Sequence, residues 1–199
     1  MRPTPWNDFA VFMTKAAWFT WVFWALLVAS AIIALIAWQR HPEQRRAGFV
    51  ASWLLRVLVG GMWWQQTLWK IPPNYDGLKY WMQQQVDHAS SALQSAFVAH
   101  IVLPHLSLFA PLVYLIEVTI SVSLLLGLLS RAGALLGLAM ALNLWLGLYS
   151  APGEWPWTYM FLVIIQAQYV IDPPGQRLGA DTLWRQMPAR GGWLAAVVA

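Results

Sequence analysis

The chain has 199 residues, of which 59% are hydrophobic and only 10% are charged, whereas soluble domains carry about 25% charged residues. This composition indicates one integral membrane domain and leaves little polar sequence for a separate soluble unit. The absence of cysteine excludes disulfides, cysteine-ligated metals and iron–sulfur clusters. The formal charge of +4 comes mostly from basic residues beside apolar blocks, which favours positive-inside sorting in a membrane over nucleic-acid binding.

Five apolar blocks predict membrane spans across a hydrocarbon core of about 30 Å. In chain order they cover residues 16–38, 49–69, 106–129, 132–149 and 157–171. The first block contains no charge and is too long for the apolar core of a secretory signal, so we expect it to be retained. Only Ser130 and Arg131 separate the third block from the fourth, which predicts a tight antiparallel hairpin. The fifth block is short and requires local bilayer thinning or burial against its neighbours.

The basic residues of the connections predict the orientation of these spans. Seven lie on one side, namely Arg40, Arg45, Arg46, Arg131, Arg177, Arg185 and Arg190. Four lie on the other, namely Arg2, Lys15, Lys70 and Lys79. The positive-inside rule then predicts that the N-terminus is outside and the C-terminus inside.

The one sizeable connection, residues 72–105, is placed outside by this orientation and predicts an amphipathic helix over residues 78–103. Apolar residues recur there at steps of three or four, at Leu78, Met82, Val86, Ala89, Leu93, Phe97 and Ile101. Such a helix commonly lies on the bilayer surface or caps a bundle. The functional alternative is a lid over a site that opens to the outer face.

Arg56 and Glu117 are ionisable residues within predicted spans, where a charge costs several kcal/mol and usually faces a partner. The helical rise puts Arg56 about 10 Å and Glu117 about 18 Å above the inner end, a difference that an Arg side chain can bridge in part. We therefore predict that the two face each other inside the bundle. Two interpretations stay open: an ion pair that fixes helix register, and a proton relay or ligand site.

Further polar residues gather toward the outer side. Lys70, surrounded by aromatic residues at the end of the second span, can hold an anion or simply extend to the interface. His88, His100 and His105 share the outer segment, with spacings that match no compact helical metal site. Asn143 and Gln66 can tie helices together by hydrogen bonds or bind a quinone carbonyl.

The order and spacing of several of these residues resemble those of the DoxX-like membrane proteins. Arg56 is followed by Gly60, Gly61 and Lys70, and Glu117 leads into the stretch from Ser123 to Arg131. More narrowly, the stretches WWQQTLWKIPP, MALNLWLGLY and EWPWTY look like the DoxD branch, the membrane subunit of thiosulfate:quinone oxidoreductase. The resemblance covers about residues 56–171.

This resemblance implies an all-α integral membrane protein built on a four-helix antiparallel bundle. Residues 48–172 would form the bundle with its outer segment. Residues 1–47, which the apolar blocks predict to be an additional N-terminal transmembrane helix and basic loop, and the tail of residues 173–199 lie outside the resemblance. The host would be a bacterial or archaeal inner (cytoplasmic) membrane.

The activity implied by the resemblance is oxidation of thiosulfate to tetrathionate, with membrane quinone as the electron acceptor. Glu117 and Arg56 would then act in catalysis, Asn143 and Gln66 would bind the quinone, and the anion would bind at Lys70, His100 and His105. The alternative is a non-catalytic accessory subunit of a larger respiratory or photosynthetic complex, in which the same polar residues hold the bundle together. Either role implies contact with lipid and with other membrane subunits.

Overall fold

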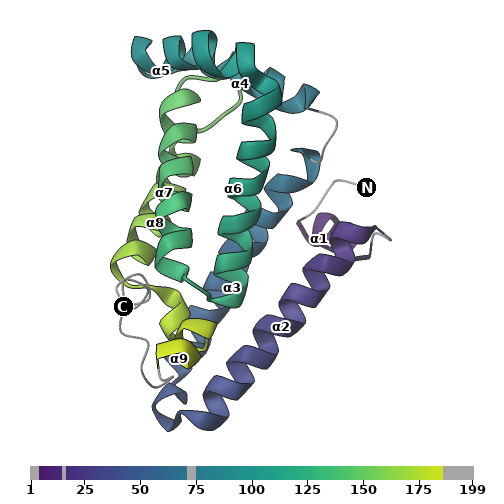
Figure 1. Ribbon diagram of the computed structural model, residues 1–199, viewed down its shortest axis with the longest axis vertical. Coiled ribbons are helices and arrows are strands. Elements are labelled where there is room, and N and C mark those ends of the chain that lie inside the picture. The colour runs from purple at the N-terminus through teal and green to yellow at the C-terminus, as the bar shows by residue number, and fades with distance from the viewer. Residues whose placement is uncertain (1–4, 15–16, 71–74, 186–199) are drawn as a thin grey trace.

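The computed structural model describes residues 5–14, 17–70 and 75–185, and this part of the chain is predominantly helical and contains no strand (Figure 1). Its α-helices are α1 (Pro5–Thr14), α2 (Trp18–Arg40), α3 (Ala47–Thr67), α4 (Asp76–His88), α5 (Ala92–Phe97), α6 (Leu106–Leu126), α7 (Ser130–Gly147), α8 (Pro156–Ile171) and α9 (Ala180–Arg185). The all-α prediction is therefore confirmed.

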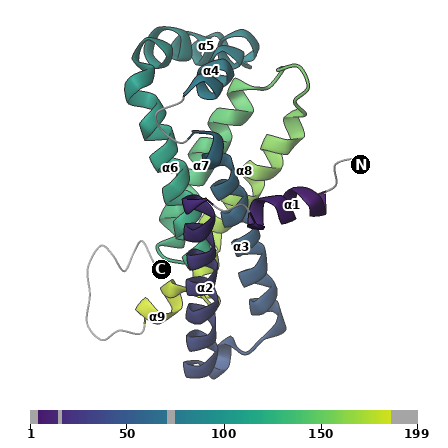
Figure 2. The same ribbon diagram turned by 90° about the vertical axis from the view of Figure 1, so that its right-hand side faces the viewer.

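Helices α3, α6, α7 and α8 form the bundle, and α2 leans against it along α6 (Figures 1 and 2). Within the bundle α6 packs against α3 and α7, and α7 packs against α8. Trp63 of α3 is buried in the bundle core together with Ile120 and Leu124 of α6. The predicted arrangement of four bundle helices and an additional N-terminal helix is thus observed.

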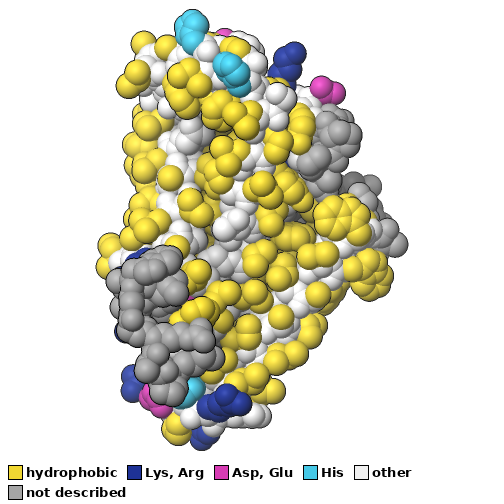
Figure 3. All heavy atoms as spheres, in the orientation of Figure 1, with side chains coloured by type: hydrophobic (Ala, Val, Ile, Leu, Met, Phe, Trp, Pro, Cys, Tyr) yellow, Lys and Arg dark blue, Asp and Glu magenta, His cyan; other side chains and the backbone are white. Residues whose placement is uncertain are grey.

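The predicted spans coincide with α2, α3, α6, α7 and α8 to within a few residues at each end. Among the described helices, three runs are long and apolar enough to cross a membrane: Trp18–Arg40, Ala47–Lys70 and Ala92–Leu126. Apolar side chains cover much of the flank of the molecule visible in Figure 3, and the charged side chains seen there gather toward its two ends. This distribution is that of a multi-pass membrane protein.

The outer segment is helical and amphipathic, but the prediction of one continuous helix over residues 78–103 is wrong. The helix breaks after α4, where Ala89 takes an extended conformation with a ψ of 149°. A new helix, α5, starts because the Ser91 side chain accepts a hydrogen bond from the Gln94 amide at 3.2 Å. The chain then turns downward through a π-helical turn, Val98–Val102, and a 3₁₀ turn, Leu103–His105, into α6. We call residues 75–105 the outer cap, and we use outer and inner for the sides that the positive-inside rule predicts.

The apolar face of the outer cap is buried on the end of the bundle. Leu78 and Met82 of α4 form one core cluster with Val98, Val102 and Ala110. The interpretation of this segment as a cap over the bundle is therefore confirmed by its packing.

At the inner end, α6 and α7 are joined by the tight hairpin that the sequence predicts. Gly127 ends α6 with a φ of +63°, a left-handed conformation that favours glycine. A Cβ atom at this position would lie 2.5 Å from Nη1 of Arg56. The close approach of Arg56 to the hairpin therefore requires glycine here.

The tail folds back onto this hairpin. The Asp181 carboxylate accepts hydrogen bonds from the Leu129 amide at 2.7 Å and from the Ser130 amide at 2.9 Å, so it caps the N-terminus of α7. Gln44 donates to the Gln176 carbonyl at 3.3 Å and accepts from the Leu178 amide at 3.0 Å. Residues 173–185 of the predicted tail are described and tied to the bundle by these contacts, while residues 186–199 lie outside the described residues.

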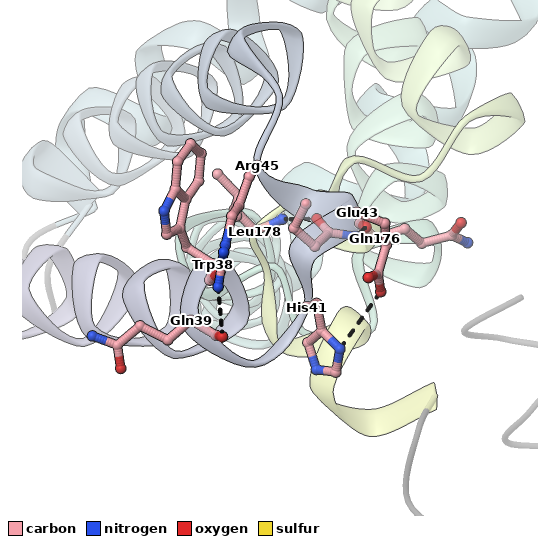
Figure 4. A network of polar contacts seen from close by, with 8 residues as sticks. Trp38, Gln39, His41, Glu43, Arg45, Gln176 and Leu178 are labelled. Carbon is pink, nitrogen blue, oxygen red and sulfur yellow. Dashed lines mark hydrogen bonds and ion pairs between the residues drawn. The ribbon is translucent and has the colours of Figure 1, made fainter.

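The short loop between α2 and α3 belongs to the same inner end, as Figure 4 shows. Arg45 donates to the carbonyl oxygens of Trp38 at 2.9 Å and Gln39 at 3.1 Å, which are unsatisfied acceptors at the end of α2. His41 and Glu43 lie 3.5 Å apart across the loop. Arg45, one of the basic residues that predict the inner side, thus also stabilises a helix terminus.

The orientation of the chain is tested by cysteines introduced one at a time at Glu43 and Lys79, which are exposed at opposite ends of the molecule. An impermeant thiol reagent added to sealed cells should label position 79 and not position 43, because the positive-inside rule puts residue 43 inside. Labelling of both positions, or of position 43 alone, would refute the predicted orientation.

Removing the Asp181 cap should destabilise the protein. Asp181→Ala should lower the free energy of unfolding in detergent by about 0.5–2 kcal/mol, the usual cost of losing an N-cap. The matched control is Asp172→Ala, because Asp172 forms a half-exposed ion pair with Arg177 and such pairs contribute only about 0–1 kcal/mol. Equal losses in the two variants would show that Asp181 does not cap α7.

Candidate functional site

A cavity of about 560 Å³ lies between the outer half of the bundle and the outer cap. Its walls come from α3, α4, α6, α7, α8 and the π-helical turn, and they are mostly apolar and aromatic. The volume falls in the range of roughly 300–1,000 Å³ that is usual for small-molecule sites. Polar side chains at a few points of such a wall would orient a ligand, so their positions indicate which chemical groups the cavity can bind.

An ion pair between Lys70 and Glu117 lies on the wall of the cavity. Lys70 ends the 3₁₀ extension of α3, Leu68–Lys70, and Glu117 lies near the middle of α6. The Lys70 ammonium contacts Oε1 of Glu117, and the two residues are only 5% and 1% exposed. The Lys70 nitrogen also lies 4.4 Å from the centroid of the Trp69 ring, where a cation is stabilised.

The predicted pairing of Arg56 with Glu117 is wrong. Arg56 instead donates to the carbonyl oxygens of Leu124 at 2.5 Å and Leu125 at 3.1 Å, which lie in the last turn of α6. It also donates to the Leu178 carbonyl at 3.3 Å. The C-terminal carbonyls of a helix lack intrahelical donors and carry partial negative charge, so they attract a cation. The Arg56 side chain therefore extends toward the inner end, away from Glu117.

Three buried polar atoms of the cavity-lining residues have no hydrogen-bond partner within the described part of the chain. They are Nε1 of Trp63, Oε1 of Gln85 and Oε2 of Glu117. An unsatisfied buried polar atom costs about 1–3 kcal/mol, so such atoms are retained where a ligand or water can reach them. The residues that line the cavity thus include at least one donor and two acceptors without a partner in the described part of the chain.

The sequence-predicted site residues divide into two groups in the structure. Lys70, Glu117, Gln66 and Asn143 all line the cavity. Asn143 accepts a hydrogen bond from Gln94 Nε2 at 2.8 Å, which links α7 to the outer cap.

Arg56, His100 and His105 do not line the cavity. Both histidines are exposed on the outer cap, and each Nδ1 lies 2.9 Å from a carbonyl oxygen one helical turn earlier. The structure therefore does not bring Lys70 together with the histidines proposed to share its anion.

Trp63 and Gln85 are lining residues that the sequence interpretation missed as site residues. Gln85 follows Leu78 by seven residues and Met82 by three, so helical periodicity puts it on the buried face of α4, and this signal was present in the sequence. Gln85 is 2% exposed and packs on Gly147 of α7, where a Cβ atom would lie 2.7 Å from its Cδ. The contact with glycine brings this amide close to α7.

A second carboxylate, Glu154, lines the cavity from the loop before α8. Tyr159 donates a hydrogen bond to its Oε2 at 2.9 Å. Glu154 is part of the EWPWTY stretch, but the sequence gives no direct indication that this loop turns back toward α6.

Comparison with protein families gives one match, in which the DoxX family model covers residues 51–150, half of the chain. The chain belongs to the DoxX family. The DoxX match runs from α3 through α7 and includes Lys70, Gln85, Glu117 and Asn143, but it ends before α8 with Glu154 and Tyr159. No curated protein and no solved structure matches the chain.

The Lys70–Glu117 pair predicts a strong energetic coupling in this DoxX protein. Lys70→Met or Glu117→Gln alone should lower the free energy of unfolding by about 3–5 kcal/mol for a charge left buried without its partner, unless water reaches it. The double variant should be more stable than the Lys70→Met variant, because no unpaired buried charge remains.

The matched control is a second cycle that combines Arg56→Met with Glu117→Gln. Since Arg56 binds carbonyl oxygens and not Glu117, the two losses should add to within about 0.5 kcal/mol. Additive losses in the Lys70–Glu117 cycle would show that this pair does not interact.

Proposed function

We propose that this DoxX-family protein is the quinone-binding membrane subunit of a thiosulfate:quinone oxidoreductase, as in the DoxD branch it resembles. The observation that carries the proposal is a cavity with mostly apolar walls that include one buried ion pair and residues with unpaired hydrogen-bond donors and acceptors. The cavity supports the quinone part of this function, and the resemblance supports thiosulfate as the electron donor.

The polar groups of the cavity match the two oxidation states of a quinone. The carbonyl oxygens of the oxidised ring accept hydrogen bonds, and Lys70 Nζ and Trp63 Nε1 are donors on the cavity wall. The hydroxyl groups of the reduced ring donate hydrogen bonds, and Glu117 Oε2 and Gln85 Oε1 are acceptors. Asn143 and Gln66 offer amide groups at the same cavity.

Reduction of the quinone must deliver two electrons and two protons. Two thiosulfate ions that join to form tetrathionate release the two electrons. Glu117 is a protonatable group beside the proposed ring position, and the Glu154–Tyr159 pair is a second one on the side of the outer loop. We propose that Glu117 passes one proton to the nearer ring oxygen and that Glu154 passes the other to the second ring oxygen, each carboxyl group being reprotonated from the outer side.

Thiosulfate itself is proposed to react at the outer face, in contact with a partner subunit. The cavity wall carries Lys70 together with two carboxylates, Glu117 and Glu154, and this charge balance disfavours a dianion inside it. His100 and His105 are exposed on the outer cap, where an anion from the outside can reach them. The anion role first assigned to Lys70 stays a prediction.

The accessory-subunit role is the second candidate, and the links between elements favour it. The Lys70–Glu117 pair joins the end of α3 to α6, and the Gln94–Asn143 hydrogen bond joins the outer cap to α7. Both contacts stabilise the bundle whether or not a ligand binds.

The assay that tests the enzymatic role uses the protein isolated with its native partners, thiosulfate and a soluble quinone analogue. Glu117→Gln should slow quinol formation by about 10²-fold or more, the usual contribution of a positioned acid or base. The control is Asp87→Asn, because Asp87 is exposed on α4 and does not line the cavity. An absence of thiosulfate-dependent quinone reduction in the unmodified complex would replace the enzymatic role with the accessory one.

A further inference from the structure

Hydrogen bonds hold the outer cap on α7 and on the loop that follows it. The Ser90 amide donates to the Leu146 carbonyl at 2.7 Å, and Gln94 Nε2 donates to Asn143 Oδ1 at 2.8 Å. The Ser150 amide donates to the His88 carbonyl at 3.2 Å, at the end of α4. A ligand that entered the cavity between the cap and α7 would have to break several of these contacts.

The side of the bundle between α3 and α8 is packed less closely than its other sides. Close backbone packing joins α3 to α6, α6 to α7 and α7 to α8 but not α3 to α8, although Leu162 and Tyr169 of α8 pack against the core cluster that contains Trp63. The outer ends of α3 and α8 stand apart in Figure 2. Backbone packing between helices of the bundle is therefore weak on the side between α3 and α8.

Some residues of α3 and α8 that line the cavity also reach the molecular surface. Met62 of α3 is 37% exposed although it lines the cavity. Gln66 of α3 and Thr158 of α8 likewise line the cavity and are exposed, and Leu162 of α8 is half-buried beside them. We call Met62, Gln66, Thr158 and Leu162 the α3–α8 seam. None of the four side chains is charged, so an apolar chain can pass between them without displacing an ion.

We infer that the α3–α8 seam admits the quinone sideways from the bilayer and that the tail of the bound quinone leaves through it into the lipid. The inference rests on the proposed function and names its substrate class, a membrane-resident quinone with a long isoprenoid tail. A cavity of about 560 Å³ accommodates the ring and the start of a tail, but it cannot enclose a chain that spans much of a bilayer leaflet. A tail that passes through the seam stays in hydrocarbon and leaves the polar groups of the cavity to the ring.

The cysteine-free chain allows a direct test with one introduced thiol. Thr158→Cys is labelled with a bulky maleimide and reconstituted into liposomes with its partners, and an unlabelled sample serves as reference. The matched control is Ile164→Cys with the same label, because Ile164 is 52% exposed on α8 and does not line the cavity. Quenching of tryptophan fluorescence reports binding, since Trp63, Trp69 and Trp81 line the cavity.

Two ligands are compared in each sample: a quinone with a long isoprenoid tail and the same ring without the tail. The label at position 158 should weaken binding of the long-tailed quinone by about tenfold or more relative to the tail-free ring, because the tail can no longer leave the cavity. The label at position 164 should leave this ratio unchanged. Retained binding of the tail-free ring shows in the same sample that the labelled protein is folded.

The outcomes separate the inference from the proposed function. An unchanged ratio at position 158, or an equal loss for both ligands, overturns the seam as the tail path while the quinone site stands. An absence of binding by either quinone in the unlabelled protein overturns the quinone site, and the seam with it.

Discussion

The ion pair between Lys70 and Glu117 determines the arrangement of the outer half of the molecule. Both residues are almost fully buried among apolar side chains, where a charge without a partner costs several kcal/mol. The 3₁₀ extension of α3 must therefore bring Lys70 to the middle of α6, which holds these two helices together beneath the outer cap. Since the pair uses only Oε1 of Glu117, its second oxygen is left for an occupant of the cavity.

Buried charges at the inner end also have partners, but these partners are helix termini. Arg56 donates to the carbonyls that end α6, and Asp181 accepts from the amides that begin α7, so buried charges there are matched by helix termini. These contacts tie the hairpin, α3 and the tail into one unit. The inner end is thus stabilised by contacts with helix termini, whereas at the outer end the unpaired polar atoms of Trp63, Gln85 and Glu117 belong to residues that line the cavity.

The DoxX match and the cavity do not involve the same set of residues. DoxX similarity covers α3 to α7, which supply the ion pair and the amides of Gln85 and Asn143. Helix α8 and the loop before it lie beyond the match but contribute Glu154, Tyr159 and the α8 side of the seam. The proposed ring-binding groups therefore belong mostly to the DoxX-matched segment, while the proposed access route and the proposed outer proton donor depend in part on residues that follow it.

The sequence alone determined the helical membrane fold, the bundle helices to within a few residues, and the presence of ionisable groups inside it. Long apolar blocks and a charge-free first span carry that information, because an apolar solvent leaves the backbone few alternatives to helices. Only the tertiary structure decided which charges meet. Height along the membrane was estimated for Arg56 and Glu117, but a long side chain can extend toward either end. The free carbonyls at the end of α6 attracted Arg56 and left Glu117 to Lys70.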